Sequence, residues 1–506
     1  MSDEAVHAAL RSEARLVVIE APAGCGKTHQ GAEYANDMAT AGGPGRPLIL
    51  THTHAACSVF AERTRGRGTR VDIRTIDSLI GQIAAAYHAG LGLPADIAAW
   101  VRARDDGHSQ LASKVSALVS RHPMIAGAVA RRHPVVICDE HQDTSADQHR
   151  VVAAVHEKGA ALRVFADPMQ RIFGDRATAA ETGCDWEALK GAADNVADLD
   201  TPHRWSRGCR DLGQWTLNAR RSLRDGGAVD LRDGHRPQSV QVVVAENRAQ
   251  RRLAYQLSAN DRAAIDVFEQ QSNSLLVLTR YNDTALSLRS FFNRRVPLWE
   301  GYTRYALDAL ASAVAAANGD GSRLGAAVVA FMGEVGIGFT PSAFGVVFER
   351  EIREGCATAR RGRPAKLQAL ARLLIERPDH RGVAAVLKRL ADLAENDVDF
   401  TGVKLDCNRE FWDATRLGDF PTIEDGLAEI THRRNYARPK PPAKAISIIH
   451  KAKGLECDAA ILMPCDRSTL PENSASRCLL YVALSRAKRR LMVVVSRQNP
   501  SPLLRI

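Results

Sequence analysis

The chain has 506 residues, of which 45% are hydrophobic and 25% charged, and it carries a formal net charge of +10. This length excludes a single ordinary hydrophobic core, so two or more domains are expected, and the composition is that of a soluble globular protein. The basic excess suits a polyanionic partner, although many soluble enzymes share it.

The sequence also argues against a membrane protein or a disulfide-stapled one. No apolar run approaches the roughly 20 residues that span a bilayer, and residues 1–7 lack the basic and apolar segments of a secretory signal. The ten cysteines are scattered and never spaced as Cys-x-x-Cys, which predicts reduced thiols and no zinc site. We therefore expect a cytoplasmic protein with no membrane partner.

The first element in chain order is a loop of small residues, Ala21–Thr28 (Ala-Pro-Ala-Gly-Cys-Gly-Lys-Thr), behind the apolar run Leu16–Ile19. A strand, such a turn and a helix start form a phosphate-binding loop, whose N–H groups and helix dipole attract an anion. Lys27 would reach the β- and γ-phosphates of ATP, and the Thr28 hydroxyl would hold Mg²⁺. The other predicted nucleotide-binding positions of the loop are Ala23, Gly24, Cys25 and Gly26. Taken alone, the loop can also be an ordinary strand-to-helix turn.

Strands and helices then alternate through the first half of the chain. Leu48–Leu50 is a short predicted strand, and Val71–Ile80 combines a strand with a helix start that Thr75 or Asp77 would cap. Residues 81–130 are Ala-rich with a helical period. Strands return within Val135–Glu140 and Ala161–Asp167. This alternation behind a phosphate loop predicts a parallel sheet covered by helices on both faces.

A second alternating pattern follows, interrupted by a helical stretch at residues 298–440. Its predicted strands are Val240–Val244, Ser274–Thr279, Ala445–Ile449, Ala459–Met463 and Leu491–Val495. We therefore expect a first α/β domain (1–80 and 131–195) with a small helical insertion (81–130). The second α/β domain (196–297 and 441–506) would carry the helical insertion domain 298–440.

Acidic and amide residues follow two of the predicted strands. Asp139 can hold Mg²⁺ through water, and Glu140 can polarise the attacking water as the general base. Gln170 follows the next strand, where its amide can sense the γ-phosphate. Each of the three, taken singly, can be an ordinary loop residue; their place behind the phosphate loop favours the catalytic assignment.

Two arginines far along the chain are candidate arginine fingers. Arg204 lies in Thr201–Trp205, and Arg486 lies in Tyr481–Lys488. A guanidinium group supplied by a second domain stabilises the transition-state charge and makes closure of the two domains depend on ATP. For an arginine picked from so many, a surface salt bridge is the alternative.

Eight segments, in order, resemble the motifs of the UvrD/Rep/PcrA-type helicases of superfamily 1. The resemblance covers most of the two α/β domains and implies the fold class: a P-loop NTPase helicase with two RecA-like parallel-sheet domains and helical insertions. In chain order the segments are Ala21–Thr28 (motif I), Leu50–Ala56 (motif Ia), Arg74–Ser78 (the Thr-Phe-His-Ser motif), Val135–Asp143 (motif II), Ala166–Phe173 (motif III), Leu199–Arg204 (motif IV), His450–Glu456 (motif V) and Leu480–Ala487 (motif VI).

The resemblance also implies a role for single residues. The ATPase site between the two domains would comprise Lys27, Thr28, Asp139, Glu140, Gln170, Arg204 and Arg486. Glu456 would contact the ribose, and His203 holds the place of the aromatic residue that stacks on the base. The residues along the track of single-stranded DNA would be Thr51, His52, His54, Thr75 and His450.

Three departures from the family pattern bear on function. No adenine-reading Gln is evident at the expected distance before Lys27, where Val6 and His7 stand. His52 replaces an aromatic residue, and Asp175 aligns with a ring that stacks on DNA. Because stacking is worth roughly 1–3 kcal/mol per base, these changes predict a competent ATPase that unwinds DNA weakly on its own.

The leading hypothesis is therefore an ATP-dependent DNA translocase or helicase that moves 3′ to 5′ on single-stranded or tailed DNA. The alternative is a regulatory, DNA-sensing ATPase subunit of an anti-phage complex, similar to the helicase subunit of the Gabija system, with an OLD-family nuclease as partner in a hetero-oligomer. A nucleotide kinase or GTPase is a weaker third interpretation, because motifs V and VI are present and an Asn-Lys-x-Asp motif is absent.

Overall fold

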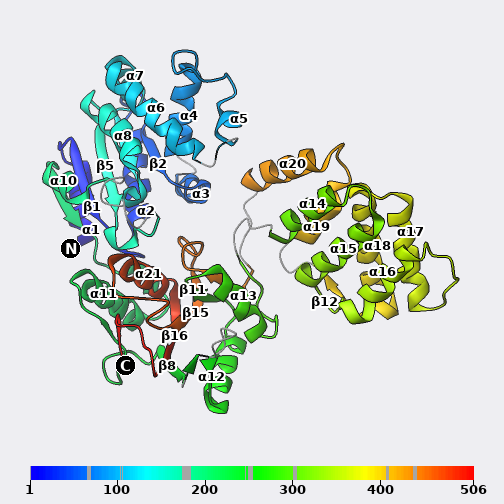
Figure 1. The fold of residues 1–506 in the computed structure, drawn as a ribbon. Coiled ribbons are helices and arrows are strands. Elements are labelled where there is room, and N and C mark those ends of the chain that lie inside the picture. Colours follow the sequence, from blue (N-terminus) through cyan, green and yellow to red (C-terminus); the bar gives the residue numbers. More distant parts are fainter. Residues whose placement is uncertain are drawn as a thin grey trace. The chain divides into compact units, whose positions relative to one another are not determined.

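The computed structural model describes residues 2–64, 70–102, 104, 106–173, 184–245, 247–248, 255–299, 305–405, 410–436 and 442–506. The chain forms two compact units (Figure 1). The first comprises Met1–Ala285 with Ile448–Ile506, and the second comprises Leu286–Ser447.

The first unit contains a six-stranded sheet in the order β3-β2-β4-β5-β1-β6, and every neighbouring pair is parallel. The five strands predicted for this half are confirmed, and the edge strand β6 was not predicted. Its sequence, Asn-Val-Ala-Asp, is short and half polar, so it lacks the continuous apolar run of a strand buried on both faces. The strands are β1 (Leu16–Glu20), β2 (Leu48–Thr51), β3 (Asp72–Thr75), β4 (Val135–Cys138), β5 (Ala161–Ala166) and β6 (Asn195–Asp198).

Helices cover both faces of this sheet, as its apolar strands require. Val17 and Ile19 of β1 pack into one core with α1–α3, and Leu16 and Val18 pack into the opposite core with α4–α8. The residues 81–130, predicted to be helical, share this second core. The helices are α1 (Ser2–Arg11), α2 (Lys27–Thr40), α3 (His54–Arg63), α4 (Ile76–Ala86), α5 (Ile97–Arg102), α6 (Gly107–Arg121), α7 (Pro123–Arg132), α8 (Ala146–Glu157) and α10 (Trp186–Gly191).

Two helix starts in this half carry clear capping chemistry. The Thr75 hydroxyl accepts a hydrogen bond of 3.1 Å from the Ser78 N–H, so Thr75 rather than Asp77 caps α4. At the start of α8, Ser145 and Gln148 form a reciprocal capping box.

A second sheet has five strands in the order β14-β11-β15-β16-β8. All five strands predicted for the second half are confirmed. They are β8 (Val240–Ala245), β11 (Leu275–Thr279), β14 (Lys444–Ile448), β15 (Cys457–Cys465) and β16 (Ala487–Ser496). The helices of this part are α11 (Arg210–Arg224), α12 (Ala259–Gln270), α13 (Asn282–Phe291) and α21 (Ser474–Leu484). Two pairs of two-residue strands lie outside the five-stranded sheet. In them β7 (Val229–Asp230) pairs with β17 (Leu504–Arg505), and β9 (Asn247–Arg248) pairs with β10 (Tyr255–Gln256). The predicted fold class, with two RecA-like parallel sheets, is confirmed.

The second unit is mainly helical, as predicted for residues 298–440. Its helices bury one apolar core, and the buried Glu410 carboxylate accepts a 2.7 Å hydrogen bond from the Leu307 N–H near the start of α14. The helices are α14 (Tyr305–Ala317), α15 (Gly321–Val335), α16 (Val346–Arg353), α17 (Arg363–Glu376), α18 (His380–Asn396), α19 (Glu410–Leu417) and α20 (Ile423–Tyr436), and β12 (Gly336–Ile337) pairs with β13 (Lys404–Leu405).

Within the described ranges, no helix combines the length and the apolar character needed to cross a bilayer.

Candidate nucleotide-binding and catalytic site

The loop between β1 and α2 needs glycine at two positions. Gly24 (φ +74°) and Gly26 (φ +90°) have left-handed backbone conformations, which residues other than glycine rarely adopt. A Cβ at Gly24 would lie 2.7 Å from the Arg204 Cβ, and one at Gly26 would lie 3.2 Å from the His203 ring. The loop therefore curls as a phosphate cradle does, and the motif IV segment lies directly against it.

Arg204 connects this loop to two later motifs. Its backbone N–H donates to the Gly24 carbonyl at 3.0 Å. Its guanidinium donates to the Glu456 carboxylate from Nε (3.0 Å) and Nη2 (2.8 Å), and from Nη1 to the Ser485 carbonyl (2.7 Å). Motifs I, IV, V and VI, separated by hundreds of residues, thus meet around one side chain.

Lys27 lies at the first position of α2 and forms an ion pair with Glu140. Burial on its own would raise the pKa of Glu140, but Lys27 and Lys453 outweigh burial and lower it to about 2. For Asp139, burial raises the pKa, and the charge of Lys27 offsets this only in part. Lys27 therefore keeps Glu140 ionised, as a general base requires.

Asp139 fits the role of a metal ligand. It is buried, and among the described residues its Oδ1 atom has no hydrogen-bond partner. A buried carboxylate oxygen without a donor is costly unless it binds a cation or a water. Thr28, the predicted second ligand, is half-buried at the start of α2.

The motif II turn holds Glu140 in an uncommon conformation. Its φ of 55° lies in the left-handed region, where a non-glycine residue stores strain that often marks a functional position. The Gln142 amide nitrogen donates to the Glu140 carboxylate, and the Gln142 amide oxygen accepts a 3.1 Å bond from the Asp167 N–H. The carboxylate is therefore oriented by a residue that is itself fixed by motif III.

Lys453 of motif V bridges motifs II and III. Its ammonium group donates to the Asp143 carboxylate and, at 2.6 Å, to the Gln170 carbonyl. Gln170 is only 4% exposed, and its amide donates to Asp167 Oδ2 at 2.9 Å. The predicted phosphate-sensing glutamine is thus held between an acid of its own motif and a lysine of motif V.

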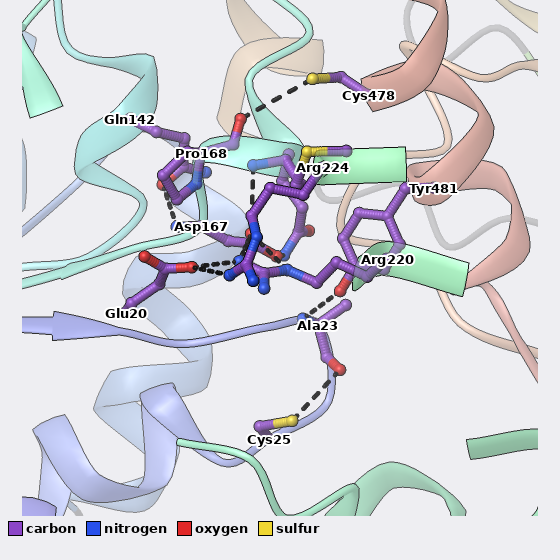
Figure 2. A network of polar contacts seen from close by, with 12 residues as sticks. Glu20, Ala23, Cys25, Gln142, Asp167, Pro168, Arg220, Arg224, Cys478 and Tyr481 are labelled. Atoms are coloured by element: carbon purple, nitrogen blue, oxygen red, sulfur yellow. Dashed lines mark hydrogen bonds and ion pairs between the residues drawn. The ribbon is translucent and has the colours of Figure 1, made fainter. Parts of the chain in front are cut away.

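A buried ionic network lies behind the loop (Figure 2). Arg220 of α11 pairs with Asp167 at 2.7 Å and with Glu20, the last residue of β1, at 2.6 Å. Burial acts to raise the pKa of Glu20, but Arg220, with smaller contributions from Lys190 and Arg224, outweighs burial, and the pKa is lowered. The Tyr481 hydroxyl accepts a 2.8 Å bond from the Ala23 N–H. Side chains of α11 and α21 therefore fix the strand ends from which the loop and motif III emerge.

The second predicted arginine finger is placed differently from Arg204. Arg486 is 1% exposed and donates to the Val482 carbonyl at 2.8 Å and to the Ser485 hydroxyl at 2.6 Å, both in its own segment. Burial and the charge of Arg204 lower its pKa to about 10. Arg486 lies beside Arg204, while Arg204 is the arginine that contacts the loop.

His203, the predicted base-stacking residue, is half-exposed beside Gly26. Its Nε2 lies 2.8 Å from the Asp3 carboxylate of α1. Helix α1, in which the adenine-reading glutamine was expected but is not found, therefore places the Asp3 carboxylate next to His203. Ala23 and Cys25 are buried, and the Ala23 N–H donates to the Tyr481 hydroxyl, so the side chains of these two loop residues face the protein interior.

Two of the five predicted DNA-contacting side chains are buried at the ends of their strands. Thr51 is 2% exposed, and Thr75 is 6% exposed and occupied in capping α4. The His52 ring nitrogen lies 3.1 Å from the Thr144 hydroxyl. His54 begins α3, and its side chain lies outside the described residues. In this conformation Thr51 and Thr75 offer no surface to a phosphate chain.

The remaining DNA prediction, His450, has an aromatic neighbour that sequence reasoning did not single out. The Phe173 ring is 50% exposed, lies 6.3 Å from the His450 ring and 5.2 Å from the Lys453 ammonium. Asp175, predicted to replace a stacking ring, lies outside the described residues. An exposed aromatic ring is thus present in motif III.

Sequence reasoning missed several residues in this site and beside it. Lys453, Tyr481 and Phe173 lie inside segments that resemble motifs, so the motif strings contained them without assigning a role. Arg220 carries no such hint, because it is one of several arginines in an amphipathic helix.

Comparisons with known families match both halves of the site. A family model described as an AAA domain matches residues 3–243, which include the loop, motif II and Arg204. A model described as the UvrD-like helicase C-terminal domain matches residues 444–494, which include Lys453, Glu456 and Arg486. Comparison with curated proteins gives no match.

Proposed function

Because the chain belongs to the UvrD-like helicases of superfamily 1, we propose that it hydrolyses ATP to move 3′ to 5′ along single-stranded or tailed DNA. The observation that carries the proposal is the position of Arg204, which bonds to the loop and to Glu456 and Ser485. An ordinary phosphate-binding enzyme has no need for such a link to a second sheet.

In the proposed reaction, the loop amides and Lys27 bind the β- and γ-phosphates, and Thr28 and Asp139 hold Mg²⁺. Bound Mg²⁺ neutralises charge on the phosphate oxygens. The phosphates compete with Glu140 for Lys27, which frees the Glu140 carboxylate to accept a proton from the attacking water. The water oxygen bonds to the γ-phosphorus as the bond to ADP breaks, and Arg204 stabilises the charge that develops.

Lys453 provides the proposed link between hydrolysis and movement. It contacts Asp143, three residues after Glu140, and the carbonyl of Gln170. A change at the γ-phosphate that shifts motif II or III would therefore be transmitted to motif V, whose first residue is His450. ATP-driven closing and reopening of such a site is the usual way in which a conformational step is coupled to chemistry.

A second candidate is a regulatory, DNA-sensing ATPase that acts with a nuclease, for which an OLD-family enzyme is the predicted partner. The burial of Thr51 and Thr75 favours it, because two predicted DNA contacts are enclosed. Such a subunit would hydrolyse ATP without efficient unwinding of its own.

One experiment distinguishes the candidates. The rate of phosphate release is measured with and without single-stranded DNA for the wild type, Glu140→Gln and the control Glu157→Gln, whose side chain is exposed at the end of α8. We expect DNA to stimulate the wild type, and the Glu140 substitution to reduce hydrolysis about 10²–10⁴-fold. Strand displacement on 3′-tailed and 5′-tailed duplexes reports the polarity.

Each outcome has a separate meaning. A rate of phosphate release that is the same with and without single-stranded DNA supports the regulatory ATPase. Undiminished hydrolysis by Glu140→Gln contradicts the assignment of the general base. Efficient unwinding of a 3′-tailed duplex by the purified protein contradicts weak autonomous unwinding.

A further inference from the structure

Three side chains that commonly bind metals converge behind the motif II turn. His141 follows Glu140, His149 lies in α8, and Cys184 lies just before α10. One ligand atom of each lies within 4.8 Å of the others, the only such group found in the described part of the chain. We propose that His141, His149 and Cys184 bind a Zn²⁺ ion.

The distances suit zinc. Zinc–nitrogen bonds of about 2.0–2.1 Å and zinc–sulfur bonds of about 2.3 Å in a tetrahedron place neighbouring ligand atoms about 3.3–3.6 Å apart. His141 Nε2 lies 3.0 Å from His149 Nδ1, and Cys184 Sγ lies 3.5 Å from the same Nδ1. These two distances are therefore within a few tenths of an ångström of the tetrahedral values, and the third pair of ligand atoms, those of His141 and Cys184, is no more than 4.8 Å apart.

The ligand chemistry also selects zinc over the cation of the nucleotide site. Two imidazole nitrogens and one thiolate form a soft N/S set, which suits Zn²⁺ and is a poor set for Mg²⁺. His141 is 1% exposed and Cys184 is 9% exposed, so bulk water has little access to them. A water molecule would complete the tetrahedron.

A second contact orients the first histidine. His141 Nδ1 lies 3.2 Å from the Thr144 hydroxyl, which leaves Nε2 to face His149 and the proposed ion. Metal-bound histidines are usually fixed in this way through their other nitrogen. The same Thr144 hydroxyl lies 3.1 Å from His52 of motif Ia, so the proposed ion is connected to that motif as well.

The proposed ion would position the catalytic turn and would not take part in the reaction. It would tie the residue next to Glu140 to α8 and to the segment before α10. Because Glu140 has a left-handed backbone, the turn benefits from an additional restraint. His141, His149 and Cys184 are therefore positioning residues, which act on the reaction only through Glu140.

The test uses the full-length protein, freed of metal by dialysis against a chelator and then titrated with Zn²⁺ alone. Bound metal is measured by mass spectrometry, and Co²⁺ replaces Zn²⁺ to reveal the absorption band of a cobalt–thiolate bond. We expect about one ion per wild-type chain, and a loss of affinity of at least about tenfold in Cys184→Ser and His149→Ala. The control Cys209→Ser, which changes a partly exposed cysteine elsewhere, should bind as the wild type does.

Thermal unfolding gives an independent readout, because a ligand that binds only the folded state raises its melting temperature. Zn²⁺ should raise the melting temperature of the wild type and of Cys209→Ser, and it should leave the melting temperature of Cys184→Ser unchanged. Wild-type protein that binds no stoichiometric zinc, or a cobalt–thiolate band that survives Cys184→Ser, would overturn the proposal. If Cys184→Ser does not fold, the comparison of His149→Cys with His149→Ala replaces it. His149→Cys keeps a metal ligand at that position and should bind one ion, whereas His149→Ala should bind zinc at least about tenfold more weakly.

Discussion

The nucleotide site and the predicted DNA track were assigned from the same set of motifs, but their side chains have different surroundings. At the nucleotide site, Arg204 and Lys453 make polar contacts with residues hundreds of positions away. On the predicted DNA track, Thr51 and Thr75 are buried within their own sheet.

The difference follows from what each region must do. A phosphate site needs several charged groups at fixed distances, and such groups can be held only by contacts from several elements. A DNA track needs side chains that are accessible, and next to His450, a predicted DNA contact, lies the exposed ring of Phe173. The three predictions below test this contrast, beginning with the largest expected effect.

Removing the guanidinium of Arg204 tests whether the contacts at the loop are functional. We expect Arg204→Ala to reduce ATP hydrolysis about 10³–10⁵-fold, the range found for arginine fingers. Binding of a fluorescent ATP analogue should change much less, because the loop and Lys27 remain. Arg207→Ala, three residues away and exposed, is the matched control. A loss no greater than that of the control would remove Arg204 from the reaction.

Arg220 tests whether the buried network stabilises the nucleotide site. In Arg220→Met the carboxylates of Asp167 and Glu20 lose their buried partner, which typically costs about 3–5 kcal/mol of unfolding free energy. Urea unfolding, followed by tryptophan fluorescence, measures the change. Arg221→Met, at an exposed position of the same helix, should have little effect. Equal midpoints for the two variants would show that the network contributes no stability.

Phe173 tests the other side of the contrast. Stacking on an aromatic ring is worth about 1–3 kcal/mol per base, so Phe173→Ala should raise the DNA concentration for half-maximal ATPase stimulation about 5- to 150-fold. Hydrolysis without DNA should stay close to that of the wild type. Tyr87→Ala, which removes another exposed ring in the first unit, serves as control. An unchanged DNA requirement would exclude Phe173 from the track.

Much of the fold could be predicted because its strands are continuous apolar runs between helices. Ten strands were expected and found, since residues such as Val17 and Val18 must be buried on opposite faces. The edge strand β6 was missed because its residues are partly exposed and carry no such pattern. For α4, the sequence offered Thr75 and Asp77 as caps, and only the backbone geometry could choose between them.

By itself, the sequence determined the phosphate loop, the strand-end acids and the order of the motifs. These features depend on neighbours in the chain: a loop such as Ala21–Thr28 is defined by its own glycines and by the strand before it. The tertiary structure decided which distant groups meet. Arg220 is one arginine among many until packing places it between two carboxylates. His141, His149 and Cys184 have no metal-binding spacing, because folding, not sequence distance, brings their ligand atoms within 4.8 Å.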